Sequence, residues 1–282
     1  MYDSLDFSMD LNRNLNIAID AALKGGVSIM EVYDGDDFQI EKKADESPLT
    51  LADSKAHNSI VEILERTEYP ILSEEGKHLA FKDRKEWNVF WLVDPLDGTK
   101  EFIKRNGEFT VNIALIENGH PVLGVVYVPV SGGLYFASKS IGAFKLDDAL
   151  NKLSHIEKDA ISLPYKKWDK RHLNVVGSRS HMSEETMNYV QNLKDEYESV
   201  EIVSKGSSLK LCLVAEGEAQ LYPRFAPTME WDTGAGQAIV EFSGGLVLNY
   251  PDLKPLRYNK ENLRNPWFIV GLNEDLIKYK LN

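Results

Sequence analysis

The chain has 282 residues, of which 43% are hydrophobic and 27% charged, a composition typical of a globular protein with one large or two smaller domains. The formal net charge of −12 argues against a nucleic-acid polymer as a partner, because binding one requires a basic surface. The single cysteine, Cys212, excludes an intramolecular disulfide and a thiolate metal cluster. It stands in an apolar run, which predicts a buried side chain.

The N-terminal ten residues are acidic and polar and do not resemble a signal peptide. No uninterrupted apolar run approaches the ~20 residues that a membrane span needs. We therefore expect a cytoplasmic protein without a transmembrane segment. Oligomeric state and peripheral association with the inner membrane are left open by the sequence.

The first part of the chain predicts two helices and a strand. Apolar residues at helical spacing predict an amphipathic helix over residues 10–33, and a short strand follows at Phe38–Lys42. A polar loop then leads into a second helix, for which Thr50 and Asp53 form a variant of the capping box. Capping is the first interpretation of Asp53.

Two acidic residues, Glu74 and Glu75, follow a short apolar strand at Ile71–Ser73. A solvated turn is the preferred interpretation of Glu75, whereas Glu74 is a candidate functional residue because of its place at the strand end. Residues 77–86 are charged and lack periodicity, which predicts a mobile surface loop.

A buried strand, Phe90–Val93, runs directly into Asp94 and Asp97. Pro95 fixes its own φ and favours an extended conformation for the aspartate before it, so that both carboxylates can point to one side of a tight loop. Gly98 lets a ligand approach the main chain closely. An ordinary acidic turn is the alternative interpretation of this stretch.

An antiparallel meander follows. Thr99 is expected to cap a short helix at residues 100–105, and Asn118-Gly119 marks a hairpin turn. The charged connector at 147–170 places a predicted domain boundary near residue 150, between an N-terminal α+β domain (1–150) and a C-terminal α/β domain (151–282). The predicted strands of the meander are Phe109–Ile116, Pro121–Val128, Leu134–Ser138 and Ala143–Leu146.

Strands and helices alternate in the second half, as in an α/β layer. The predicted strands are His172–Val176, Val200–Val203, Ala219–Tyr222, Leu246–Leu248 and Trp267–Val270. The predicted helices are Ser183–Tyr197, Ser208–Glu216 and Glu230–Phe242.

Four acidic residues now stand at the ends of predicted elements: Glu74, Asp94, Asp97 and Asp232. Asp232 also suits a helix N-cap. Grouped on one site, the four negative charges would need neutralising, and oxygen-only ligands suit a hard cation such as Mg²⁺. Two such ions about 3.5–4 Å apart would clamp a phosphate ester for in-line displacement. The pattern therefore favours metal-assisted phosphate-ester hydrolysis.

These residues resemble the inositol monophosphatase superfamily of Mg²⁺-dependent, Li⁺-sensitive phosphatases. Asp94 to Thr99 (DPLDGT) matches its first signature, Trp231-Asp232 matches the second, and Glu74-Glu75 matches the upstream acidic pair. Within the superfamily the chain is most similar to the bacterial CysQ-type 3′(2′),5′-bisphosphate nucleotidases, through Trp91–Ile116 and Gly206–Arg224. The resemblance spans nearly the whole chain and implies a layered αβαβα sandwich with the active site between its halves.

The resemblance implies a role for each matching residue. The metal positions are Glu74, Asp94, Asp97, Asp232 and the main-chain carbonyl of Leu96, for two or three Mg²⁺ per active site. Asp53 and Thr99 match the pair that activates the attacking water, so that capping becomes the second interpretation of Asp53. The predicted catalytic residues are Asp53, Thr99 and Glu74. The backbone N–H groups of Gly98 and Thr99 would hold the scissile phosphate.

The resemblance also implies where the substrate binds. The predicted contacts from the C-terminal half are His181, Ser207, Ser208, Lys210 and Arg224, together with Leu96, Asp97, Gly98, Thr99 and Asp232 from the metal site. Arg179, also at a family position, is interpreted as a solvated charge. The basic residues among these predicted contacts supply the local positive charge that an anionic substrate needs on an acidic protein.

We therefore expect an enzyme of sulfate assimilation that removes the 3′-phosphate of adenosine 3′,5′-bisphosphate to give AMP and phosphate. It could also act on 3′-phosphoadenylyl sulfate. One alternative is inositol monophosphatase or fructose-1,6-bisphosphatase activity, against which Arg224 and the Ser207–Lys210 block argue. Another is a nucleotide sensor without catalysis, against which the intact Asp53–Thr99 pair argues. The expected partner is a small phosphorylated nucleotide.

Overall fold

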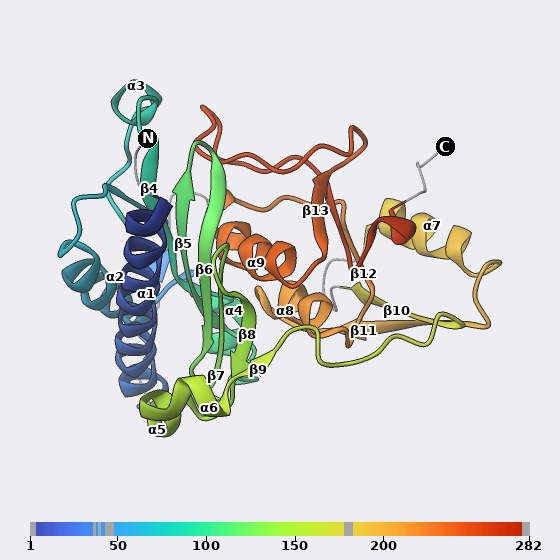
Figure 1. Ribbon diagram of the computed structural model, residues 1–282, viewed down its shortest axis with the longest axis horizontal. Coiled ribbons are helices and arrows are strands. Elements are labelled where there is room, and N and C mark those ends of the chain that lie inside the picture. The colour runs from blue at the N-terminus through green and yellow to red at the C-terminus, as the bar shows by residue number, and fades with distance from the viewer. Residues whose placement is uncertain (1–3, 36–37, 39–40, 43–47, 178–182, 278–282) are drawn as a thin grey trace.

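The computed structural model of the chain describes residues 4–35, 38, 41–42, 48–177 and 183–277. In this part of the chain the structure has two larger sheets, of seven and five strands, and one two-stranded ribbon formed by β1 (Glu41–Lys42) and β2 (Pro48–Leu49). Figure 1 shows the two larger sheets separated by a pair of helices.

The first sheet is a meander in which β3 pairs in parallel with β4 and each later strand is antiparallel to the one before it. This confirms the predicted meander, and β9 adds a strand from the charged connector. Its strands, in spatial order, are β3 (Ile71–Ser73), β4 (Val89–Asp97), β5 (Thr110–Glu117), β6 (His120–Val128), β7 (Gly133–Ser138), β8 (Gly142–Leu146) and β9 (Ile161–Ser162).

The second sheet is mixed. Its neighbours β11, β10 and β12 run parallel, and β14 is antiparallel to both β12 and β13. Its strands, in spatial order, are β11 (Ser199–Ser204), β10 (His172–Gly177), β12 (Leu221–Arg224), β14 (Phe268–Gly271) and β13 (Leu246–Asn249).

The helices complete five layers. α1 and α2 cover the outer face of the first sheet, α8 and α9 lie between the sheets, and α7 covers the outer face of the second sheet (Figure 1). This is the predicted αβαβα sandwich. The helices are α1 (Ser4–Tyr33), α2 (Leu51–Leu64), α3 (Phe81–Arg84), α4 (Thr99–Ile103), α5 (Ala149–Lys152), α6 (Ile156–Asp159), α7 (Glu184–Leu193), α8 (Leu209–Glu216) and α9 (Glu230–Phe242), with 3₁₀ turns at Leu153–His155 and Glu274–Leu276.

Each apolar layer follows from the residue pattern. The alternating strands of the first sheet turn one set of side chains toward α1 and α2 and the other toward α8 and α9, and both sets are buried. Cys212 of α8 is buried in the second of these cores, as predicted. Burial of apolar surface on both faces of one sheet therefore fixes α9 directly behind β5 and β6.

The prediction for residues 77–86 is wrong. Residues 77–86 were expected to form a mobile surface loop, but they contain α3, and its Arg84 side chain is only 2% exposed. The guanidinium donates hydrogen bonds to residues 259–261, far away in the chain. Smaller differences occur at element ends: α1 starts at Ser4, and α7 ends at Leu193.

A helix that crosses a bilayer needs about 20 mostly apolar residues. Among the helices that the structure describes, none combines the length and apolar character that crossing a membrane requires.

Candidate active site

The signature aspartates lie in a β-bulge near the end of β4. Asp94 pairs with Asn112 of β5 and Asp97 with Thr110, so two residues of β4 stand opposite one residue of β5. The backbone N–H of Leu96 donates to Asp94 Oδ1 at 3.1 Å, which closes the bulge. The bulge lies within the strand, and not in a loop after it as the sequence suggested, so the sheet itself holds both carboxylates in place.

The turn after the bulge is made by Gly98, which has a φ of 95° and is the N-cap of α4. A left-handed conformation of this kind favours glycine. Thr99 is therefore the first residue of the helix and not its cap. Its hydroxyl is left available to the site.

Parallel pairing brings Glu74 to the same place. Ser73 of β3 stands opposite Val93 of β4, and the backbone N–H of Glu74 donates to the Val93 carbonyl at 3.1 Å. Glu74 thus follows β3 beside the position where Asp94 occurs in β4. The two carboxylates meet because parallel neighbours run in register.

Asp232 arrives from the other half of the molecule, on α9. A Cβ on Gly124 of β6 would lie 2.4 Å from the carbonyl oxygen of Ala235, and a Cβ on Gly234 would lie 2.8 Å from Leu92 Cδ2. Glycines at these two points let α9 approach the sheet closely. Asp232 is the third residue of the helix, and its Oδ2 accepts the Met229 N–H at 2.9 Å, so it caps the helix from inside and is not the N-cap itself.

Glu74, Asp94 and Asp232 form the group with metal-ligand geometry among the described residues: each offers an oxygen, and the three atoms lie within 4.8 Å of one another. Burial, then the nearby charges of Asp97 and Glu74, raise the pKa of Asp232 to about 8. Carboxylate oxygens crowded in this way fit a hard divalent cation, which would neutralise them.

Asp53 and Thr99 meet on the α2 side of the bulge. The Thr99 hydroxyl lies 3.2 Å from Asp53 Oδ1 and 3.4 Å from the Leu96 carbonyl oxygen. The second oxygen, Asp53 Oδ2, accepts the N–H of Thr50 at 2.7 Å and its hydroxyl at 2.6 Å. The two interpretations of Asp53 are therefore compatible, because one oxygen caps α2 and the other faces the site.

Asp97 joins the first sheet to the segment before α8. Its Oδ2 accepts the hydroxyls of Ser207 at 2.7 Å and Ser208 at 2.8 Å, and the Asn112 amide at 3.3 Å. The Ser208 hydroxyl, which has one proton to donate, also lies 2.7 Å from the carbonyl oxygen of Asp232. Ser207 holds a φ of 52°, which is uncommon for a residue with a side chain. The predicted substrate residues Ser207 and Ser208 thus contact the predicted metal site directly.

A cavity of about 590 Å³ opens beside this site. Both predicted cationic contacts of the described residues, Lys210 and Arg224, line it with Asp97 and Asp232. Burial lowers the pKa of Lys210, an effect that the charge of Asp97 opposes, and the Lys210 ammonium donates to the Ser207 carbonyl at 2.7 Å. Arg224 Nε is buried and has no hydrogen-bond partner among the described residues, which suits an anion from outside the protein.

Several residues of the site were missed by the sequence analysis. Asn112 and Thr110 hold Asp97 and Ser207, and the Glu108 carboxylate accepts the Gly206 N–H at 2.9 Å. Three further lysines line the cavity: Lys100, Lys104 and Lys205. The spacing of Lys100 and Lys104, one helical turn apart after the aspartate signature, is a signal that could have identified them. The predicted contact His181, with Arg179, lies outside the described residues.

The bulge, the acidic group and the five-layer sandwich define a class of protein. The chain belongs to the inositol monophosphatase family, whose model matches residues 10–265. Bacterial 3′(2′),5′-bisphosphate nucleotidases named CysQ are similar to it in sequence. The Shigella flexneri protein is 47% identical over 255 residues, with 89% of this chain and 96% of that protein covered, and the Escherichia coli K12 protein is 46% identical over the same shares.

Solved structures agree with this assignment. The crystal structure of CysQ from Bacteroides thetaiotaomicron superposes with a TM-score of 0.85 at 51% identity, covering 93% of this chain and 98% of that one. The suppressor protein SuhB from Bartonella henselae superposes with a TM-score of 0.70 at 24% identity, over 93% and 94% of the two chains, which shows the shared fold alone.

Proposed function

We propose that this protein is a Mg²⁺-dependent 3′(2′),5′-bisphosphate nucleotidase that removes the 3′-phosphate of adenosine 3′,5′-bisphosphate, leaving AMP and phosphate. The observation that carries the proposal is a shared cavity. Lys210 and Arg224 line the same cavity as Asp97 and Asp232. The carboxylates suit a cation-assisted reaction at a phosphate, and the lysine and arginine suit a second anionic group. The names of the CysQ relatives support the same substrate class.

The metal positions in this proposal are Glu74, Asp94, Asp97, Asp232 and the Leu96 carbonyl, of which three carboxylates already lie close together. Mg²⁺ held there would offset their charge and polarise the scissile phosphate. Two or three ions per site are proposed, as the family resemblance implies. The backbone N–H groups of Gly98 and Thr99 would contact the phosphate oxygens.

The proposed catalytic pair is Asp53 and Thr99. Asp53 Oδ1 accepts a hydrogen bond from the Thr99 hydroxyl. This bond turns a lone pair of the hydroxyl oxygen toward the attacking water. Because Thr50 holds the other oxygen of Asp53 through two hydrogen bonds, the carboxylate cannot rotate away. Orientation of the water by fixed groups lowers the barrier without any movement during the reaction.

The basic residues of the cavity favour a bisphosphate among the candidate substrates. A neutral polyol phosphate, such as inositol 1-phosphate, would leave Lys210 and the unpaired Arg224 Nε without an anionic partner. Unpaired buried polar groups cost affinity, and this favours the bisphosphate. 3′-Phosphoadenylyl sulfate, which carries an additional anionic group, is a proposed second substrate and would place the enzyme in sulfate assimilation.

Phosphate release from purified protein tests the proposal. With Mg²⁺, we expect kcat/KM to be highest for adenosine 3′,5′-bisphosphate and its sulfated form, and much lower for inositol 1-phosphate and fructose 1,6-bisphosphate. The opposite order would reject the substrate assignment. Tight binding of the bisphosphate without phosphate release would instead identify a nucleotide sensor.

A further inference from the structure

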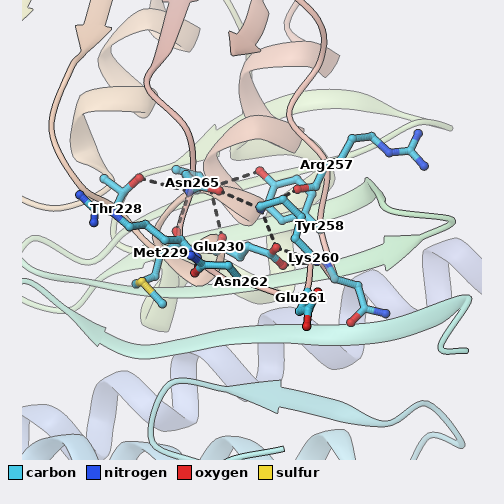
Figure 2. Close-up of polar contacts among 12 residues, drawn as sticks. Thr228, Met229, Glu230, Arg257, Tyr258, Lys260, Glu261, Asn262 and Asn265 are labelled. Atoms are coloured by element: carbon cyan, nitrogen blue, oxygen red, sulfur yellow. Dashed lines mark hydrogen bonds and ion pairs between the residues drawn. The ribbon is translucent and has the colours of Figure 1, made fainter. Parts of the chain in front are cut away.

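The first turn of α9, which carries Asp232, is surrounded by buried polar groups that the proposed reaction does not use. Glu230 is completely buried, at 0% exposure. Its Oε2 accepts the N–H of Asn259 at 2.7 Å, and its Oε1 accepts the N–H of Lys260 at 3.0 Å and the Lys260 ammonium at 2.6 Å. Figure 2 shows Glu230 between Asn265 and Lys260, two residues of the segment that runs from Arg257 to Asn265.

The same segment holds the backbone just before Glu230. Asn265 donates through Nδ2 to the Met229 carbonyl at 2.7 Å, and the Glu230 N–H donates to the Leu263 carbonyl at 2.9 Å (Figure 2). Asn265 also lies 2.9 Å from the Thr233 hydroxyl. Segment 257–265 therefore fixes the start of α9 on both sides of Asp232.

Arg84 ties this segment to the other half of the molecule. Its guanidinium donates to the Asn259 side chain at 2.8 Å, to the Lys260 carbonyl at 2.8 Å and to the Glu261 carbonyl at 3.0 Å. Asn259 returns a hydrogen bond, from Nδ2 to the Arg84 carbonyl at 2.7 Å. The contact is reciprocal and partly buried.

The position of Arg84 in the chain gives the contact its significance. Arg84 lies between β3 and β4, the two strands whose ends carry Glu74 and Asp94. A continuous path of hydrogen bonds thus runs from that connection, through Asn259 and Lys260, to Glu230, two residues before Asp232. It links the two halves that supply the acidic group.

The rest of α9 cannot set this position alone. It meets the first sheet through Ala235, Ala238 and Ile239, and apolar contacts have no preferred direction. Buried charges are costly compared with apolar side chains of similar size, whereas hydrogen bonds fix direction and distance. Charged groups are concentrated at the start of α9, the end nearest the acidic group. This indicates that Asp232 must be placed precisely.

We propose that Glu230 and Arg84 are positioning residues, which hold Asp232 at the correct distance from Glu74 and Asp94 for a divalent cation. The inference rests on the proposed metal site. Neither residue is among those that line the cavity, and both act only through segment 257–265.

Direct metal binding tests the proposal without reference to turnover. Mn²⁺ is titrated into the purified full-length protein, and free ion is measured by electron paramagnetic resonance. Glu230→Gln keeps the shape of the side chain but loses the charge and replaces one acceptor by a donor, which then faces the N–H of either Asn259 or Lys260. We expect the Kd for Mn²⁺ to rise about 10-fold or more, the range found when groups that orient metal ligands are changed.

A second variant avoids a folding defect. Asn259 has a φ of 67°, which glycine adopts readily, so Asn259→Gly keeps the backbone and its N–H to Glu230 while removing two of the four hydrogen bonds that join Arg84 to this segment. We expect a smaller rise of the Kd in the same direction. Unchanged Mn²⁺ affinity in this variant would overturn the proposal whether or not Glu230→Gln folds.

The matched control is Glu216→Gln. Glu216 is also a buried carboxylate with a lysine partner, Lys145, at 2.9 Å, and it accepts the Tyr135 hydroxyl at 2.8 Å, but it lies at the far end of α8. Glu216→Gln should lower the Tm of the protein and leave its Kd for Mn²⁺ unchanged. Equal Mn²⁺ affinities across wild type, control and test variants would mean that the network is only structural. Absence of Mn²⁺ binding in the wild type would instead reject the metal-dependent function proposed above.

Discussion

Asp53 and Thr99 are 46 residues apart in the chain, yet the threonine Oγ1 lies 3.2 Å from Oδ1 of the aspartate. The other carboxylate oxygen, Oδ2, accepts two hydrogen bonds from Thr50 at the start of α2. The helix cap and the proposed catalytic contact therefore share one side chain. This arrangement makes the orientation of the Thr99 hydroxyl depend on the fold of α2.

Replacing either member of this pair should reduce the chemical step. We expect Thr99→Val to lower kcat by about 10²–10⁴-fold, the range for loss of a positioned proton-transfer group, with little change in KM. Thr99→Ser keeps the hydroxyl and should retain most activity. The double variant Asp53→Asn with Thr99→Val should be little worse than Thr99→Val alone, because the two residues act as a unit. Steady-state kinetics of phosphate release would measure this, and additive losses would contradict it.

Asp97→Asn should leave the fold intact and remove activity. An asparagine oxygen can still accept hydrogen bonds from Ser207 and Ser208, so segment 205–208 should keep its place. The negative charge is lost, and we expect phosphate release to fall by about 100-fold or more. Asp195→Asn, at an exposed carboxylate, is the control. A variant with normal activity at ordinary Mg²⁺ concentrations would show that Asp97 is not needed for the cation.

Much of the architecture could be predicted from the sequence because its signals are local. Alternation at period two identifies the meander, and α9 has the bounds that the helical pattern predicted. Residues 77–86 were misassigned because the partners of Arg84 lie about 175 positions further along the chain. Charged side chains are mostly exposed, so a charged residue is predicted to be solvated unless its partners can be identified. The partners of Arg84 are too far away in the chain to be identified from the neighbouring residues.

In the site, too, only the features that depend on neighbouring residues could be predicted from the sequence. The β4 bulge follows from local chemistry, namely two aspartates around Pro95. The convergence of Asp232 with Glu74 and Asp94 could not follow from spacing and was expected only from the family resemblance. Asn112 and Thr110 were missed because a strand pattern assigns them to a sheet face and does not show that one of them contacts Asp97.

Substrate preference should change when Lys210 is shortened. Lys210→Ala removes an ammonium from the cavity that Asp97 and Asp232 also line, and a hydrogen bond to a charged group contributes about 1.5–3 kcal/mol. We expect KM for adenosine 3′,5′-bisphosphate to rise about 10- to 100-fold. KM for adenosine 3′-monophosphate, which lacks the second phosphate, should change far less. Lys170→Ala, at an exposed lysine, controls for loss of net charge; equal effects on both substrates would contradict the assignment.

The pH dependence of substrate binding should also report on Lys210. Burial lowers its pKa, so the ammonium loses its proton at a lower pH than an exposed lysine does. KM for the bisphosphate should therefore rise as the pH increases from about 7 to about 9.5, while the phosphates, with a second pKa of about 6, keep their charge. Lys210→Arg stays charged throughout and should flatten this rise. Parallel KM profiles for wild type and Lys210→Arg would exclude Lys210 as the titrating group.

Gly124→Ala should affect both stability and metal binding, although Gly124 lies in β6 and is not itself a candidate ligand. Its new Cβ would lie 2.4 Å from the Ala235 carbonyl oxygen and 2.7 Å from Ala238 Cβ, so α9 would have to move away from the sheet. Overpacking of this kind costs about 1–3 kcal/mol of folding free energy, which urea denaturation would measure. Because α9 carries Asp232, the Kd for Mn²⁺ should rise in the same variant. Gly133→Ala, whose Cβ would meet the Ser131 hydroxyl at 3.3 Å and Val128 Cγ2 at 4.0 Å, should change neither quantity appreciably. A destabilised Gly124→Ala protein with wild-type Mn²⁺ affinity would show that the acidic group tolerates a shift of α9, and the close helix–sheet approach would then serve packing alone.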